Sequence, residues 1–221
     1  MLSYTEENYL KTLLKLAVEK GEAGTNELAT MLGVKPATAT DMLKKLREKK
    51  LIDYEKYGKI TLTDEGKQCA VSVVRRHRLW ETFLYEKLAF SWDEIHELAE
   101  QLEHIQSEKL VERLDKFLNY PVFDPHGDAI PNAQGEMREP IRKTLNDEIV
   151  GHRCKMVAVK DNSSAFLQYV DKTGLALHKT ITVLSKHAYD ELLEIDIEGQ
   201  KVTVSHKFAC NILVACEACE K

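Results

Sequence analysis

The chain has 221 residues, of which 43% are hydrophobic and 30% are charged, as expected for a globular protein of one to three domains. No segment approaches the roughly 18 consecutive apolar residues that a membrane helix needs. The first ten residues lack the basic and apolar regions of a signal peptide. We therefore expect a cytoplasmic protein with no membrane partner, and the odd number of five cysteines favours free thiols over a disulfide framework.

Apolar residues recur at helical spacing in residues 6–20, which predicts a first amphipathic helix that ends at Gly21. Two more helices are predicted over residues 25–32 and 35–49, and Gly33 lies between them. From residue 52 the pattern changes to the alternation of a β-hairpin, centred on Gly58. A helix, a glycine-containing turn, a second helix and a hairpin predict a winged helix-turn-helix.

The second half of the chain changes character at a Pro-, Gly-, Asn- and Asp-rich segment, residues 121–140, which is typical of a linker. Before it we predict helices, which cover residues 63–88, 91–106 and 107–118. After it we predict one helix, residues 164–172, among short strands that form a small β-barrel domain. These strands cover residues 155–159, 180–184, 193–197 and 201–204.

The winged helix-turn-helix carries the positive charge of an otherwise acidic chain. The net charge is −5, yet residues 35–59 contain eight basic and four acidic residues, a net charge of +4. The third helix would enter the major groove of DNA, with its first residues near base edges: Lys35, Ala37, Thr38 and Thr40. Its later basic residues would contact phosphates: Lys44, Lys45 and Arg47. The wing would present Tyr57 and Lys59.

Histidine and carboxylate side chains gather on two of the predicted helices. His77 and Glu81 are four residues apart and therefore share a helix face. A second group follows with spacings of 4, 3 and 1, namely His96, Glu100, Glu103 and His104. Nitrogen and carboxylate donors on two neighbouring helices can converge on one or two divalent ions, so the pattern favours a metal site over scattered surface residues.

Three other functions compete with a metal-responsive DNA-binding protein. A metal-trafficking accessory that uses only the C-terminal domain is disfavoured because it would leave residues 25–63 unexplained. A metalloenzyme is disfavoured because no HExxH motif is present, so we predict no enzymatic activity and no small-molecule substrate. A winged-helix regulator that senses an organic ligand would leave the histidines and carboxylates as surface residues. Substitution of His77 or Glu103 separates this alternative from a metal sensor.

Four segments resemble the diphtheria toxin repressor family of metal-dependent regulators, and above all its manganese transport regulator branch. They are residues 4–11 (YTEENYLK), 75–81 (RRHRLWE), 96–104 (HELAEQLEH) and 124–131 (DPHGDAIP). Residues 145–215 look like the SH3-like, FeoA-type domain of longer members. The resemblance implies a mainly α fold with a small β domain. Its parts would be a winged helix-turn-helix at 1–63, a helical dimerisation and metal-binding domain at 64–140 and an SH3-like β-barrel at 141–221.

The resemblance also implies two metal sites. The primary site would contain Asn8, Glu100, Glu103 and His104. The second would contain His77, Glu81, His96 and a residue of the third domain, for which Gln168 matches the family and Asp161 lies nearby. Two positions depart from the family pattern: relatives carry Met or Asp in place of Asn8, and the manganese branch carries a carboxylate in place of Lys11.

The position of Glu100, where iron-responsive relatives carry Cys, bears on the choice of metal. A carboxylate in place of a thiolate favours Mn(II) over softer ions, so Mn(II) is predicted, with Fe(II) as the alternative. Zn(II) and Co(II) are expected to bind in vitro. The resemblance implies a homodimer that binds palindromic, double-stranded operator DNA when loaded with metal and represses metal-uptake genes. The alternative within the family is an iron-responsive repressor.

Overall fold

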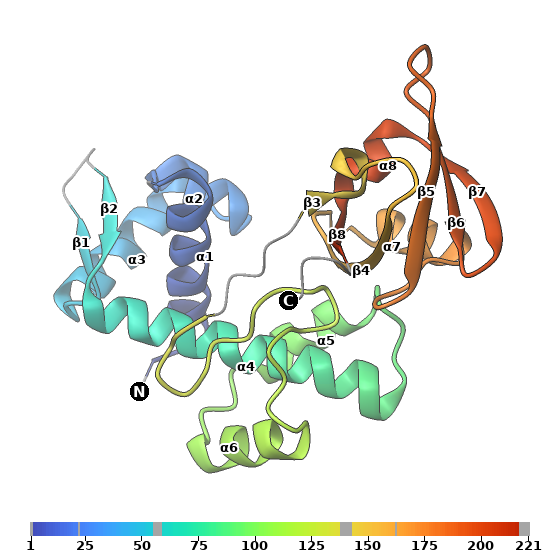
Figure 1. Ribbon diagram of the computed structural model, residues 1–221. Helices are drawn as coiled ribbons and strands as arrows, with labels where there is room; N and C mark the ends of the chain where they lie inside the picture. Colours follow the sequence, from blue (N-terminus) through green and yellow to red (C-terminus); the bar gives the residue numbers. More distant parts are fainter. Residues whose placement is uncertain (1, 22, 55–58, 138–142, 162, 217–221) are drawn as a thin grey trace. The chain divides into compact units, whose positions relative to one another are not determined.

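The computed structural model describes residues 2–21, 23–54, 59–137, 143–161 and 163–216 (Figure 1). The chain forms two compact units. Unit 1 comprises Met1–His77, Glu100–Arg113 and Pro131–Met137, and unit 2 comprises Arg78–Ala99, Leu114–Ile130 and Arg138–Lys221. The boundary between them runs through two continuous helices, α4 (Asp64–Leu88) and α5 (Ile95–Leu102).

Unit 1 begins with α1 (Tyr4–Lys20), which local interactions define at both ends. The Ser3 hydroxyl accepts a hydrogen bond from the backbone of Glu6, whose side chain accepts one from the backbone of Ser3. Gly21 ends the helix in the left-handed region, with φ of 76°. The first helix is therefore confirmed, and it starts two residues earlier than its apolar pattern predicts.

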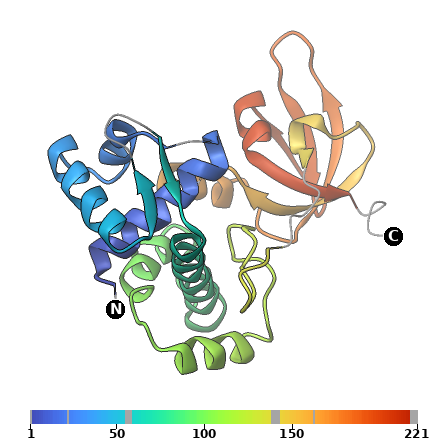
Figure 2. The ribbon, with the colours of Figure 1, turned by 90° about the vertical axis from the view of Figure 1, so that its left-hand side faces the viewer.

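The predicted winged helix-turn-helix is confirmed. It consists of α2 (Thr25–Met31), α3 (Pro36–Glu48), β1 (Ile52–Tyr54) and β2 (Ile60–Leu62). The two strands pair antiparallel, with Ile52 opposite Leu62, and Figure 2 shows them beside α3 in a view nearly along α4. Fully buried leucines of the three helices form one core, which holds α1 against α2 and α3: Leu10, Leu13, Leu16, Leu28, Leu43 and Leu46.

Gly66, in the first turn of α4, allows this helix to approach the backbone before β1. A Cβ atom at Gly66 would lie 1.8 Å from the backbone oxygen of Leu51. Helix propensity alone predicts that Gly66→Ala stabilises the fold by about 1 kcal/mol. We expect the opposite, a loss of about 1–3 kcal/mol in the free energy of unfolding, because the backbone must shift. Urea unfolding measures it. Gly24→Ala is the control, because nothing lies within 4 Å of its Cβ position, and an equal loss there would contradict the steric explanation.

The helices after α4 are shorter than predicted. The Ser91 backbone donates to the Glu94 carboxylate as in a capping box, but a turn follows and α5 begins only at Ile95. Glu103 and His104 lie in a turn just past the end of α5 rather than on the helix. The prediction of one helix over residues 91–106 is therefore wrong at both ends. Helix α6 spans Glu108–Phe117.

Unit 2 contains an antiparallel sheet of six strands in the order β3-β8-β4-β5-β6-β7, which confirms the predicted small β domain. The strands are β3 (Lys143–Thr144), β4 (Arg153–Val159), β5 (Thr180–Lys186), β6 (Leu193–Ile197), β7 (Gln200–Val204) and β8 (Ile212–Cys216). Alternate residues of β4, β5 and β6 are buried and form its core.

Short helices complete this sheet domain. They are the 3₁₀ helix η1 (Leu145–Asp147), α7 (Ser164–Lys172) and α8 (His206–Asn211). The ring of Phe208 on α8 contacts the rings of Phe166 and Tyr169 on α7. Strands β3 and β8 and helix α8 were not predicted from the sequence. None of the helices in the described ranges has the length and apolar character of a membrane span.

Candidate metal centre

Glu103 is the most buried acidic side chain of the metal-binding pattern, and it lies in unit 1 beside α1. Its two carboxylate oxygens are 2.7 and 2.8 Å from the Lys11 ammonium, and Oε2 is 2.6 Å from Nδ1 of His77. Burial alone would raise the pKa of Glu103. The hydrogen bond from His77 and the charge of Lys11 outweigh burial and hold this pKa below its usual value. Glu103 is therefore an ionised carboxylate that is fully engaged by protein groups.

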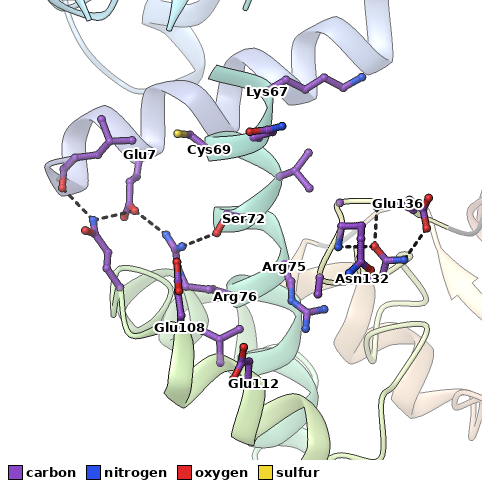
Figure 3. A pocket seen from close by; sticks show the side chains of 18 of the residues that line it. Glu7, Lys67, Cys69, Ser72, Arg75, Arg76, Glu108, Glu112, Asn132 and Glu136 are labelled. Atoms are coloured by element: carbon purple, nitrogen blue, oxygen red, sulfur yellow. Dashed lines mark hydrogen bonds and ion pairs between the residues drawn. The ribbon is translucent and has the colours of Figure 1, made fainter. Parts of the chain in front are cut away.

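Glu7, which lies outside the sets predicted from the sequence, connects α1 with His104. Its Oε2 atom is 2.6 Å from Nδ1 of His104, and its Oε1 atom accepts hydrogen bonds from Arg76 at 2.6 Å and from Gln106 at 3.0 Å. Figure 3 shows Arg76 between Glu7 and Ser72. Both Glu7 and Arg76 are buried. The only sequence signal was an acidic residue next to the predicted ligand Asn8.

Asn8 and Glu100 lie at the margin of this cluster. Asn8 is half-buried on α1, and its backbone carbonyl accepts a hydrogen bond from the Thr12 hydroxyl. Glu100 is exposed at 52% of its side chain and lies 3.5 Å from the Lys11 ammonium. Two members of the predicted primary set therefore contact α1. Glu103 contacts Lys11, and His104 contacts Glu7.

A second cluster is formed by His77 and Glu81, one turn apart on α4, and by His96 at the start of α5. One donor atom from each of these side chains lies within 4.8 Å of the others. Nδ1 of His96 is 3.0 Å from Glu81. Nδ1 of His77 pairs with the Glu103 carboxylate. A carboxylate that orients a histidine through its second nitrogen is typical of metal sites.

His126 adds an imidazole to this cluster from the loop before Ile130. It is buried, it stacks on Trp92 with ring centroids 5.9 Å apart, and its Nε2 atom is 3.5 Å from Glu81. Within the described residues neither ring nitrogen of His126 makes a hydrogen bond. His126 therefore places an imidazole nitrogen beside the Glu81 carboxylate of this cluster. The metal sites predicted from the sequence did not include His126.

The loop of His126 is held by Asp124, which accepts hydrogen bonds from the backbones of His126 and Asp128 at 2.8 and 2.9 Å. Burial and the nearby Glu81 carboxylate raise the pKa of Asp124 to about 7. Burial lowers the pKa of His126, but Glu81 and Asp124 outweigh it and raise this pKa above its usual value. Both shifts include a contribution from the negative charge of the buried Glu81 carboxylate, which favours a cation beside it.

The two predicted third-domain ligands have other partners. The Gln168 amide on α7 donates to Asp93, in the turn before α5, at 2.8 Å. Asp161 accepts a hydrogen bond from the backbone of Ser163 at 2.9 Å, which lowers its pKa. Their role as metal ligands stays a prediction. Gln168 on α7 contacts Asp93, which precedes the predicted ligand His96 by three positions in the sequence.

The predicted DNA-contacting residues of α3 are accessible. Exposed side chains run along it: Lys35, Ala37, Thr38, Lys44, Lys45 and Arg47. The half-buried Thr40 donates to the carbonyl of Pro36 at 2.9 Å. Lys59 is exposed next to β2, whereas the predicted wing residue Tyr57 lies outside the described residues.

Three family descriptions match the chain in succession. They are "Iron dependent repressor, N-terminal DNA binding domain" at residues 1–60, "Iron dependent repressor, metal binding and dimerisation domain" at 63–132, and "FeoA domain" at 143–216. The iron-dependent repressor IdeR of Mycobacterium leprae is 32% identical over 218 residues, which are 93% of this chain and 94% of that protein. IdeR of Mycobacterium tuberculosis H37Rv is 32% identical over 127 residues, which are 58% of this chain and only 55% of that protein.

The chain is also similar to another regulator and to solved repressors, one of them manganese-dependent. The regulator MntR of Oceanobacillus iheyensis is 34% identical over 114 residues, 52% of this chain and 77% of that protein. A solved manganese-dependent transcriptional repressor in complex with manganese has a TM-score of 0.79 at 35% identity, and covers 96% of this chain and 99% of its own. ScaR with bound Zn²⁺ has a TM-score of 0.70 at 35% identity, with the same coverage.

Proposed function

Because the chain belongs to the iron-dependent repressor family of transcriptional regulators, we propose that it is a metal-dependent repressor that binds operator DNA as a homodimer when Mn(II) is bound. The observation that carries the proposal is the convergence of His77, Glu81 and His96 within 4.8 Å. The matched ranges support the predicted division into residues 1–63, 64–140 and 141–221. Its action on DNA places the protein in the cytoplasm, and we propose no enzymatic role.

The donors of this cluster fit a divalent ion. His77, Glu81 and His96 would hold it, and His126 is a fourth donor at the same carboxylate. When bound, the ion supplies the positive charge that offsets the buried acids at Glu81. His77 is kept in place by Glu103, and His96 is kept beside Glu81, so both imidazoles are oriented before binding.

The choice of Mn(II) rests on the absence of thiolates from this set of described donors. Imidazole and carboxylate donors accept Mn(II) and Fe(II), whereas a thiolate selects softer ions. Affinity order alone places Mn(II) last among first-row divalent ions, so Zn(II) and Co(II) are expected to bind in vitro as well. A manganese-dependent repressor among the similar solved structures supports the proposal, and Fe(II) is the alternative, as in the name of the similar iron-dependent repressor IdeR.

For DNA binding we propose that the N-terminal end of α3 reads base edges in the major groove. Lys35, Ala37, Thr38 and Thr40 would lie there, and Lys44, Lys45 and Arg47 would contact phosphates, with Lys59 and Tyr57 on the wing. Two such helices in a dimer require a palindromic operator of fixed half-site spacing. Repression of metal-uptake genes is the output that this arrangement would serve.

Operator binding is expected to depend on the metal. With a fluorescent duplex selected from a random pool in the presence of Mn(II), anisotropy should show tight binding at micromolar Mn(II) and weak binding in chelator. The difference in Kd is expected to be about 5–150-fold, the usual range of a coupling free energy between sites. By the same coupling, the duplex should tighten Mn(II) binding by the same factor.

Parallel titrations with Fe(II) and Zn(II) identify the ion. A response to Fe(II) alone would contradict the manganese assignment and favour an iron-responsive repressor. Equal affinity for DNA in chelator and in all three metals would refute the metal-dependent function. It would favour a winged-helix regulator that senses an organic ligand.

A further inference from the structure

Lys11 places a positive charge where the predicted primary site would need its metal ion. Its ammonium lies 2.7 and 2.8 Å from the two oxygens of Glu103 and 3.5 Å from Glu100. The Lys11 side chain is 20% exposed and that of Glu103 is fully buried, so this contact is largely shielded from water. A lysine ammonium is a compact point charge with three donors, which suits it to two carboxylates.

Two donors of the predicted primary set have further protein partners. Oε2 of Glu103 pairs with His77, and Nδ1 of His104 pairs with Glu7 at 2.6 Å. A divalent ion at Glu103 would have to displace an ammonium that is attached to α1 and cannot diffuse away. The two positive charges of the ion would also lie within a few ångströms of the Lys11 ammonium, and this repulsion is unfavourable. The Lys11 ammonium therefore opposes a divalent ion at Glu103.

We propose that Lys11 is a tethered cation that replaces a metal ion at the contact between α1 and the end of α5. The protein would then bind its regulatory ion only at His77, Glu81 and His96. This inference rests on the proposed function, since it concerns which part of a metal-dependent repressor holds the metal.

The same contacts connect His77 with the DNA-binding element within unit 1. His77 contributes one nitrogen to the ion site, and its other nitrogen contacts Glu103, which holds Lys11 on α1. Helix α1 shares a hydrophobic core with α2 and α3. Both ends of this chain of contacts lie in unit 1. Occupancy at His77 therefore acts on α1 through a permanent ion pair instead of a second ion.

Metal stoichiometry of the full chain tests the proposal. Equilibrium dialysis against Mn(II) should give one ion per wild-type chain, and two for Lys11→Met, which removes the charge but keeps much of the length. Lys11→Arg keeps the charge and should bind one. Lys15→Met is the matched control from the same helix: Lys15 is 61% exposed and pairs only with Glu19 in the described structure. It too should bind one ion.

Two further variants locate the ion while Lys11 itself is kept. His96→Ala should abolish the wild-type ion, and Glu100→Gln should retain it. The double variant Lys11→Met/His96→Ala should bind one ion, at Glu103. Two ions per wild-type chain, or an ion lost in Glu100→Gln and kept in His96→Ala, would overturn the inference and leave the proposed function intact. No ion at all, together with metal-independent operator binding, would refute the proposed function instead.

Thermal unfolding in chelator gives a readout that does not depend on DNA. Lys11→Met leaves the buried Glu103 carboxylate without its lysine partner, so its Tm should fall by roughly 5 °C, and Mn(II) should restore it. Lys15→Met should keep the wild-type Tm. An unchanged Tm for Lys11→Met in chelator would contradict the role of Lys11 as a structural cation. If Lys11→Met does not fold, the stoichiometries of wild type, His96→Ala and Glu100→Gln still decide the question.

Discussion

His96→Ala is expected to raise the Mn(II) concentration for half-maximal operator binding about 100-fold or more. The substitution removes one of three converging donors, and even the loss of an outer-shell partner costs about 10–100-fold in metal affinity. The His96 side chain is 51% exposed, so the variant should fold normally. Anisotropy with a fixed duplex, titrated with Mn(II), measures the shift, and thermal unfolding checks the fold.

His152→Ala is the matched control. His152 is 47% exposed, and its Nδ1 atom lies 3.1 Å from the buried carboxylate of Glu148, so its environment resembles that of His96. It lies outside the converging donors, and its variant should keep the wild-type Mn(II) response. An equal shift for both variants would mean that the loss of any such histidine weakens the protein, and a full response by His96→Ala would remove the proposed ion site.

Arg76→Met is expected to destabilise the fold by about 3–5 kcal/mol, more than Gly66→Ala. The guanidinium pairs with buried Glu7 at 2.6 Å, donates to the carbonyl of Glu103 past the end of α5, and contacts Ser72 at 2.9 Å. Its loss leaves the Glu7 carboxylate in a buried place without its strongest partner. Thermal unfolding followed by circular dichroism should show Tm lower by roughly 10 °C.

Arg113→Met is the control for this prediction, because Arg113 is exposed on α6. It makes the same chemical change at the surface and should leave Tm within error. A similar Tm for Arg76→Met and wild type would show that His104 and Gln106 suffice to hold the Glu7 carboxylate. Addition of Mn(II) should not rescue Arg76→Met, since Arg76 is not among the proposed ligands.

The sequence alone predicted the winged helix-turn-helix, because helical and alternating periods over residues 6–63 are long enough to read. It also placed His77 and Glu81 on one helix face, since that depends only on helix geometry. It failed where the chain is irregular. Glu103 and His104 follow α5 in a turn, and no local pattern shows that the helix ends at Leu102.

Which side chains face one another was decided by the tertiary structure. Spacing within α1 could not show that Lys11 rather than Asn8 reaches Glu103, 92 residues away. Nor could it show that Glu7 holds His104, 97 residues away, or that His126 lies beside Glu81. Helical and alternating periods arise from backbone geometry, so they can be recognised from residues that are close in the sequence. Ion pairs between distant segments depend on how those segments pack. The sequence therefore indicated the residue types of a metal-responsive repressor. Only the tertiary structure determined which side chain pairs with each carboxylate.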